Sequence, residues 1–135
     1  MSNKILTIDQ GTTSSRAIIF NINGDIEHIS QEEYPLIYPK DGWVEIEPKV
    51  LKQSVINTIK KVPLDNVGCI GITNQRETTL VWDKTTFEPI YNAIVWQDRR
   101  TASYCDSIRT SQIEQTIKTK TGLQLDPYFS ATKIK

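Results

Sequence analysis

The chain has 135 residues and a mass of 15.4 kDa, with 24% charged and 38% hydrophobic side chains. Its 16 basic and 16 acidic side chains leave no formal net charge, which argues against a nucleic-acid-binding protein, because phosphate contacts need a basic surplus. A lone histidine, His28, and two distant cysteines, Cys69 and Cys105, exclude a multi-histidine metal site and a disulfide framework.

The apolar segments are short. The longest runs fall far below the roughly 20 residues that a membrane span requires. The N-terminal apolar stretch ends at Asp9 and cannot serve as the core of a signal peptide. Both cysteines can stay reduced in a cytosol. We therefore expect a soluble, cytoplasmic protein that binds neither a membrane nor nucleic acid.

The first part of the chain predicts a meander of strands over residues 4–8, 16–22 and 26–34. The second strand contains a continuous apolar run, residues 17–20, and we expect it to be buried on both faces. Asn23 and Gly24 tolerate positive φ and predict a tight hairpin between the second and third strands.

A helix follows from Pro48, which suits a first helical turn, to the breaker Pro63. Its apolar side chains fall on one face, which we expect to pack on the core: Leu51, Val55, Ile59 and Val62. The apolar run over residues 67–73 then predicts a strand buried inside a sheet. This strand-helix-strand order suggests a crossover after the meander.

The rest of the chain predicts short elements: strands over residues 79–82 and 90–95, and helices over 99–109 and 112–120. Gly122 is a suitable stop for the second of these helices. Asp126 and Pro127 resemble the N-cap and first residue of another helix, which has no closing signal before residue 135. We expect the chain to be truncated.

A polar turn after the first strand is a candidate phosphate site. Asp9 at the end of the strand suits Mg²⁺, Gly11 permits close approach of a ligand, and Arg16 adds a positive charge. Four successive hydroxyl residues lie between Gly11 and Arg16: Thr12, Thr13, Ser14 and Ser15. Neither a GxxxxGK[ST] nor a GxGxxG motif is present. The alternative is an ordinary hairpin turn rich in threonine and serine.

A second polar cluster follows the strand predicted over residues 67–73. Arg76 offers only donors and Glu77 only acceptors, a pair that suits the hydroxyls of a neutral polyol, although a surface ion pair is the alternative. Both can face one ligand only if the strand has already ended. Trp96 can form an apolar wall or belong to the core, and Tyr128 can donate a hydrogen bond or merely pack.

Four segments in order along the chain resemble the glycerol kinases of the FGGY carbohydrate kinase family. They are DQGTTSSR at residues 9–16, GITNQRETT at 71–79, AIVWQDRRT at 93–101 and TGLQLDPYFSATK at 121–133. The NQRE stretch is the piece that distinguishes glycerol kinases from family members that act on pentuloses.

The resemblance implies an α/β, ribonuclease-H-like (actin-like ATPase) fold, with residues 1–135 as a partial N-terminal domain containing a mixed β-sheet and flanking helices. It implies that Thr12, Thr13, Ser14 and Arg16 contact the phosphates of ATP and that Asp9 lies near Mg²⁺. It also implies that a glycerol site is formed by four residues: Arg76, Glu77, Trp96 and Tyr128.

The resemblance further implies a C-terminal lobe that is absent here, a general base downstream of residue 135 and a homo-oligomeric full-length enzyme. We therefore expect no kinase activity from this chain alone. The alternatives are a noncatalytic remnant or split-gene product, and a kinase for a related polyol or sugar.

Overall fold

A computed structural model describes residues 3–135, and their contacts group them into two units. Unit 1 combines the residues up to Leu36 with Ile46–Arg76, and unit 2 combines Ile37–Glu45 with Glu77–Lys135.

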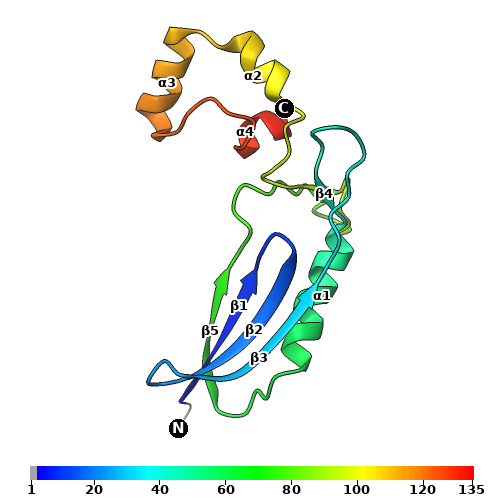
Figure 1. Cartoon of the computed structure of the whole chain (residues 1–135), viewed down its shortest axis with the longest axis vertical. Helices are drawn as coiled ribbons and strands as arrows, with labels where there is room; N and C mark the ends of the chain where they lie inside the picture. Colours follow the sequence, from blue (N-terminus) through cyan, green and yellow to red (C-terminus); the bar gives the residue numbers. More distant parts are fainter. Residues whose placement is uncertain (1–2) are drawn as a thin grey trace. The chain divides into compact units, whose positions relative to one another are not determined.

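Unit 1 is built on a four-stranded sheet in the order β3-β2-β1-β5, with β3 and β5 at opposite edges (Figure 1). β1 pairs antiparallel with β2, β2 pairs antiparallel with β3, and β5 pairs parallel with β1. This meander, crossover helix and parallel strand agree with the mixed sheet that the family resemblance implies. The elements are β1 (Lys4–Gln10), β2 (Ser14–Asn21), β3 (Ile26–Glu33), α1 (Pro48–Lys60) and β5 (Val67–Thr73).

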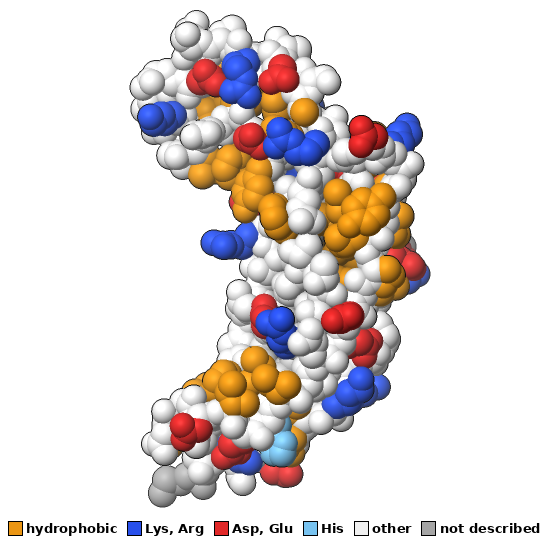
Figure 2. Space-filling view, in the orientation of Figure 1, with side chains coloured by type: hydrophobic (Ala, Val, Ile, Leu, Met, Phe, Trp, Pro, Cys, Tyr) orange, Lys and Arg blue, Asp and Glu red, His pale blue; other side chains and the backbone are white. Residues whose placement is uncertain are grey.

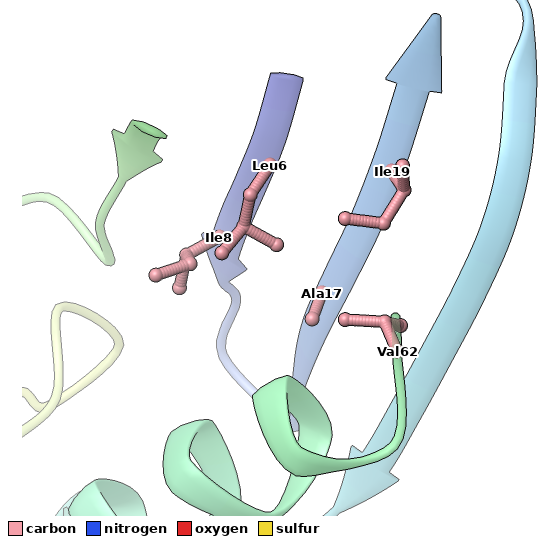
Figure 3. Close-up of a cluster of buried hydrophobic side chains, with 5 residues drawn as sticks. All are labelled: Leu6, Ile8, Ala17, Ile19 and Val62. Carbon is pink, nitrogen blue, oxygen red and sulfur yellow. The ribbon is translucent and has the colours of Figure 1, made fainter. Parts of the chain in front are cut away.

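The core of unit 1 lies between the sheet and α1. Alternate residues of β1 and β2 point to one face of the sheet and meet the segment that follows α1 (Figure 3). Burying apolar surface stabilises a fold by roughly 25 cal/mol per Å², so these contacts are the main source of stability of unit 1. The cluster consists of Leu6, Ile8, Ala17, Ile19 and Val62, with Val55, Ile59 and Val67 packed against it.

The structure confirms the predicted core face of α1 and adds two hydroxyls to it. Leu51 is buried as expected, but Ser54 and Thr58 are buried as well. Their hydroxyl groups donate to backbone carbonyls one turn earlier in the helix, so neither is left without a partner. The prediction that β2 is buried on both faces was wrong, because Ile18 remains half-exposed while Ala17 and Ile19 are fully buried.

The hairpin between β2 and β3 is longer than the predicted two-residue turn. Only Gly24 has a positive φ, of 90°, whereas Asn23 keeps a negative one. Gly24 donates its N–H to the carbonyl of Asn21, and Asn21 in turn pairs with the carbonyl of Asp25. This is a turn followed by a left-handed glycine, the usual three-residue hairpin loop.

β5 was predicted as a buried strand, and the structure corrects this: it is an exposed edge strand. Ile70 and Ile72 are 60% and 73% exposed, and Cys69 is also exposed. Apolar sequence indicates burial only when a further element covers the strand, and β5 has β1 as its one partner in the sheet. A patch of hydrophobic side chains is visible on this sheet in Figure 2.

Unit 2 consists of short elements joined by long turns. A two-stranded sheet pairs β6 (Ala93–Ile94) with β4 (Glu45–Ile46), of which Glu45 belongs to unit 2. Three helices follow: α2 (Ala102–Ile108), α3 (Ser111–Thr121) and α4 (Ser130–Ile134). Gly122 ends α3 with a φ of 73°, as the sequence predicted.

The strand predicted over residues 79–82 is reduced to two isolated bridges, and the strand predicted over 90–95 is shortened to β6. Thr79 pairs with Ile94 and Trp82 with Pro89, so the segment around Asp83 is held mostly by turns. The Asp83 carboxylate accepts the N–H groups of Thr85 and Thr86. These bonds satisfy the turn locally, and a longer ladder does not form.

Two predicted helix starts were also wrong. The helix expected from residue 99 begins at Ala102. Asp126 does not cap a helix directly, since its carboxylate accepts the N–H of Tyr128 at 2.8 Å and closes a turn. α4 then begins at Ser130. Asp and Asn side chains stabilise such turns as readily as helix caps, which explains the error.

A buried ion network fixes the inner part of unit 2. Arg100 donates to Glu45 Oε1 at 2.7 Å and to Asp98 Oδ2 at 2.9 Å, and its guanidinium lies 3.8 Å from the centroid of the Trp43 ring. Burial alone would raise the pKa values of Glu45 and Asp98, but hydrogen bonds from Arg100 and neighbouring groups outweigh it and lower both.

The two cysteines are free thiols, Cys69 exposed and Cys105 buried. Across residues 3–135, no helix combines the length and apolar character needed to cross a bilayer.

Candidate functional site

The candidate phosphate turn joins β1 to β2 in unit 1. Gly11 donates its N–H to the carbonyl of Ser14 at 3.0 Å, and a Cβ at Gly11 would lie 3.2 Å from that same oxygen. The carbonyl of Gly11 accepts two side-chain hydrogen bonds, from the Tyr34 hydroxyl and from Gln75 Nε2. The turn is therefore held from both sides, which leaves little freedom for its N–H groups to move.

The four hydroxyl residues of this turn do not share one environment. Thr13 is exposed and Thr12 is half-buried, whereas Ser14 and Ser15 are buried. Ser14 Oγ accepts Gln31 Nε2 at 3.2 Å, and Ser15 Oγ lies 2.8 Å from Ser54 Oγ on α1. Thr13 is thus presented to solvent, and the serines anchor the turn to β3 and α1.

Asp9 and Arg16 face each other across the β1–β2 pair. Arg16 Nη1 lies 3.2 Å from Asp9 Oδ2, and its Nε donates to Gln31 Oε1 at 3.1 Å. Both side chains are partly exposed, so this ion pair contributes little to stability. It places one carboxylate and one cation beside the turn, accessible from solvent.

Glu77 opens the main segment of unit 2 in an unusual backbone conformation. Its φ is 61°, in the left-handed region that few residues other than glycine adopt. Ser130 at the start of α4 donates to Glu77 Oε2 through its N–H at 3.2 Å and through its hydroxyl at 3.3 Å. Strained backbone that neighbouring contacts hold in place is often found at functional sites.

Trp96 and Tyr128 lie together in unit 2. Their ring centroids are 5.8 Å apart, with the planes inclined at 61°, and Tyr128 also packs edge-on against Phe129 at 5.0 Å. Both rings are half-buried, so each keeps an exposed part. An open hollow of about 350 Å³ is lined by Tyr128 and Phe129, together with Leu123 and Asp126 among others.

Arg76 is exposed and is the last residue of unit 1, directly before Glu77 in the chain. β5 ends at Thr73, three residues before Arg76. The strand has therefore ended before both residues, which is the condition under which Arg76 and Glu77 can face one ligand.

Lys133 contacts the segments of unit 2 that carry Glu77, Trp96 and Tyr128, although the sequence analysis did not single it out. Its ammonium donates to the backbone carbonyls of Glu77, Val95 and Tyr128, at 3.3, 3.2 and 3.0 Å. Burial lowers its pKa below the ordinary value for lysine. The i, i+3 spacing of Ser130 and Lys133 on a helix was the one available signal that both could reach the same neighbour.

Comparison with known proteins identifies the family. The N-terminal domain of the FGGY family of carbohydrate kinases matches residues 4–135. The chain belongs to the FGGY family of carbohydrate kinases. Its mixed sheet and flanking helices accordingly form part of the actin-like ATPase fold of these kinases.

Among curated relatives of this FGGY chain, glycerol kinase of Clostridium botulinum strain Hall is 55% identical over 141 aligned positions. Glycerol kinase of Rhizobium meliloti strain 1021 is 51% identical over 140 positions. These alignments cover 100% and 99% of this chain and 28% of each relative. The chain thus spans a little over a quarter of the length of the relatives that it matches.

Solved structures of the FGGY family superpose closely on the chain. Plasmodium falciparum glycerol kinase with ADP has a TM-score of 0.89 at 36% identity, covering 98% of this chain and 28% of that one. A ligand-bound xylulose kinase from Lactobacillus acidophilus has a TM-score of 0.87 at 26% identity, covering 97% of this chain and 27% of that one. The backbone of this part is therefore shared by kinases with different names.

Proposed function

We propose that the chain is the N-terminal part of an ATP-dependent glycerol kinase that phosphorylates glycerol to sn-glycerol 3-phosphate. The observation that carries this proposal is the gathering of Glu77, Trp96 and Tyr128 in unit 2, in a chain 55% identical to a glycerol kinase. Each of these residues was expected at a polyol site from the sequence.

The polyol site combines opposite chemistries. The Glu77 carboxylate accepts hydrogen bonds from hydroxyls, the Arg76 guanidinium donates to them, and the Tyr128 hydroxyl does either. Trp96 offers an apolar ring to the C–H face of the carbon chain. Such a set binds a neutral polyol without requiring net charge, which agrees with the balanced composition.

The phosphate site lies on the β1–β2 turn. Thr12 and Thr13 donate hydroxyl and backbone hydrogen bonds to phosphate oxygens, Ser14 supports the turn and Arg16 supplies positive charge. The conformation of the Gly11 turn is already held by Tyr34 and Gln75. Binding a nucleotide therefore costs little additional ordering of the backbone.

Asp9 is the proposed contact to Mg²⁺. Within residues 3–135, no group of three or more His, Cys, Asp and Glu side chains is arranged to hold a metal. A single exposed carboxylate at a strand end nevertheless suits Mg²⁺, which keeps several waters and binds through one or two carboxylates and the phosphates themselves. The ion would neutralise charge on the transferred phosphoryl group.

In the reaction, a terminal hydroxyl oxygen of glycerol bonds to the γ-phosphorus of ATP while the bond to the bridging oxygen breaks and ADP leaves. The hydroxyl proton passes to a base that we place in the part of the protein beyond this chain. This chain's residues position and orient the two substrates, which accounts for most of the catalysis of phosphoryl transfer. We expect the isolated chain to be inactive, and we propose a cytoplasmic, homo-oligomeric full-length enzyme.

A chimaera tests this proposal. The chain replaces the matching 28% of Clostridium botulinum glycerol kinase, and ADP release is measured with and without glycerol. We expect glycerol-dependent turnover that Arg76→Ala lowers by about 10- to 100-fold in kcat/KM, because a charge-assisted hydrogen bond contributes about 1.5 to 3 kcal/mol. A folded chimaera without glycerol-dependent turnover would contradict the proposal.

A kinase for a related polyol or sugar is the second candidate, favoured by the backbone match to a xylulose kinase, whose TM-score of 0.87 is almost that of the glycerol kinase. The same chimaera separates the two substrates, since a preference for a pentulose over glycerol would support it. A noncatalytic remnant is tested by mixing the chain with the separately expressed remainder of the relative. Restored activity would favour a split kinase over a remnant.

A further inference from the structure

We propose that Lys133 is the positioning residue of the polyol site, holding Glu77, Trp96 and Tyr128 in place through their backbone without touching the substrate. This inference rests on the proposed function, because it deepens the account of the same site. Lys133 is itself part of α4, and the residues that it holds come from three separate segments of unit 2.

Lys133 connects three segments through hydrogen bonds from its ammonium group. An ammonium group has three N–H donors, and Lys133 directs hydrogen bonds to three carbonyl oxygens, at 3.0 to 3.3 Å. The acceptors belong to Glu77, to Tyr128 and to Val95, whose next residue is Trp96. The one side chain therefore links every segment of unit 2 that supplies a proposed glycerol contact.

Placing the charged ammonium of Lys133 in a half-buried position costs free energy, which suggests that its charge has a role. A half-buried ammonium loses hydration, and the desolvation lowers its pKa. Its hydrogen bonds go to backbone carbonyls, and the charges of Asp98 and Glu77 offset part of the desolvation. An ordinary surface lysine would extend into water and keep its full hydration.

Glu77 has a strained backbone conformation that the contact with Lys133 helps to hold. Glu77 adopts a φ of 61°, a left-handed conformation that is strained for a residue with a Cβ. Lys133 holds the Glu77 carbonyl while Ser130, three residues earlier in α4, holds its carboxylate and carbonyl. Backbone and side chain of Glu77 are thus fixed from the same short helix.

The positions of the Trp96 and Tyr128 rings depend on Lys133 in the same way. The centroids of the Trp96 and Tyr128 rings are 5.8 Å apart. Lys133 binds the backbone carbonyl of Tyr128 itself and that of Val95, the residue before Trp96. Releasing the two carbonyls would let the segments separate. The apolar wall and the phenol hydroxyl would then no longer face one ligand together.

The test uses the 135-residue chain with Lys133→Met, which keeps the length of the side chain but removes its donors. Lys133→Arg retains charge and donors, and Lys120→Met is the matched control on the exposed face of α3. Two quantities are measured by NMR: the dissociation constant for glycerol and the nuclear Overhauser contacts between the Trp96 and Tyr128 rings. Thermal unfolding verifies that each variant is folded.

We expect Lys133→Met to weaken glycerol binding at least tenfold and to lose the contacts between the two rings. Lys133→Arg should restore part of both, and Lys120→Met should match the unmodified chain. Partial rescue is the result that a purely space-filling role of the side chain would not give. If Lys133→Met does not fold, Lys133→Gln is judged by the same two measurements.

The outcomes separate the two claims. If the unmodified chain binds glycerol and folded Lys133→Met binds it equally well with the ring contacts intact, the positioning role is wrong and the proposed function stands. If glycerol binds neither to the unmodified chain nor to the chimaera with Clostridium botulinum glycerol kinase, the proposed function fails. The ring contacts then decide the positioning role: their loss in Lys133→Met supports it, and their retention overturns it.

Discussion

Gln75 donates a hydrogen bond from its Nε2 to the backbone carbonyl oxygen of Gly11, 64 residues earlier in the chain, over 2.8 Å. Gln75 of the NQRE stretch, which is buried in unit 1, thus supports the candidate phosphate turn. The next two residues, Arg76 and Glu77, belong to the proposed polyol site. One sequence motif therefore contributes to both proposed substrate sites.

Replacing Gln75 by leucine should loosen the phosphate turn. The change removes one of the two side-chain donors to the partly buried carbonyl of Gly11, so we expect a loss of about 1 kcal/mol in the free energy of unfolding. Urea denaturation measures this loss. The exposed Gln124→Leu is the control and should change stability by less than about 0.5 kcal/mol. Equal effects of the two substitutions would show that the contact is unimportant.

Arg100→Met should strongly destabilise unit 2. The substitution strands the buried carboxylates of Glu45 and Asp98 without their cation, and breaking a buried pair in this way costs about 3 to 5 kcal/mol. Arg99→Met, the adjacent position, removes only an exposed ion pair with Asp126 and should cost less than about 1 kcal/mol. Denaturant titrations of the two variants provide the comparison, and similar losses would refute the role given to the network.

The same network predicts acid sensitivity. The pKa values of Glu45 and Asp98 are lowered in the folded chain, so below their ordinary values, near 4, the unfolded chain binds more protons than the folded one. Their contribution is present in full above that pH and is lost as the pH falls through the lowered pKa values. The free energy of unfolding between pH 7 and pH 2 should therefore fall more steeply in the unmodified chain than in Arg100→Met. Parallel curves would be evidence against this.

The exposed edge strand predicts self-association that a charge should suppress. β5 presents Ile72, 73% exposed, beside unpaired backbone groups, and such edges tend to pair with other chains. Ile72→Lys should reduce association in sedimentation experiments and change stability by no more than about 0.5 kcal/mol. Ile8→Lys, the neighbouring position on β1 that faces the core, should unfold unit 1. A large stability loss in Ile72→Lys would mean that Ile72 is packed in solution.

Periodicity predicted the parts of the fold that depend on local pattern. The first strand, the apolar face of α1 and the stop at Gly122 were all confirmed, because each follows from a local apolar pattern or from a single conformational requirement. The exposure of β5 could not be predicted, since an apolar run does not reveal whether another element covers it. The helix start at Ser130 was missed because Asp126 suits a turn as well as a cap.

The sequence suggested which residue types form the candidate site, but not the residues that hold them in place. Glu77, Trp96 and Tyr128 follow strands or turn signals, and the sequence places them after those elements. Lys133 and Ser130 lie more than 50 residues from Glu77, and no local spacing relates them to it. Long-range contacts to backbone carbonyls leave no residue pattern, so the structure was needed to find them.

Binding of glycerol to the 135-residue chain tests the central claim most directly. Glycerol and a pentulose are titrated separately while the NMR signals of Trp96 and Tyr128 are followed, with Glu77→Gln as the matched variant that keeps the size of the side chain. The account predicts saturable shifts with glycerol, weaker ones with the pentulose, and loss of the glycerol response in Glu77→Gln. An equal or stronger response to the pentulose, or a glycerol response that survives in Glu77→Gln, would contradict it.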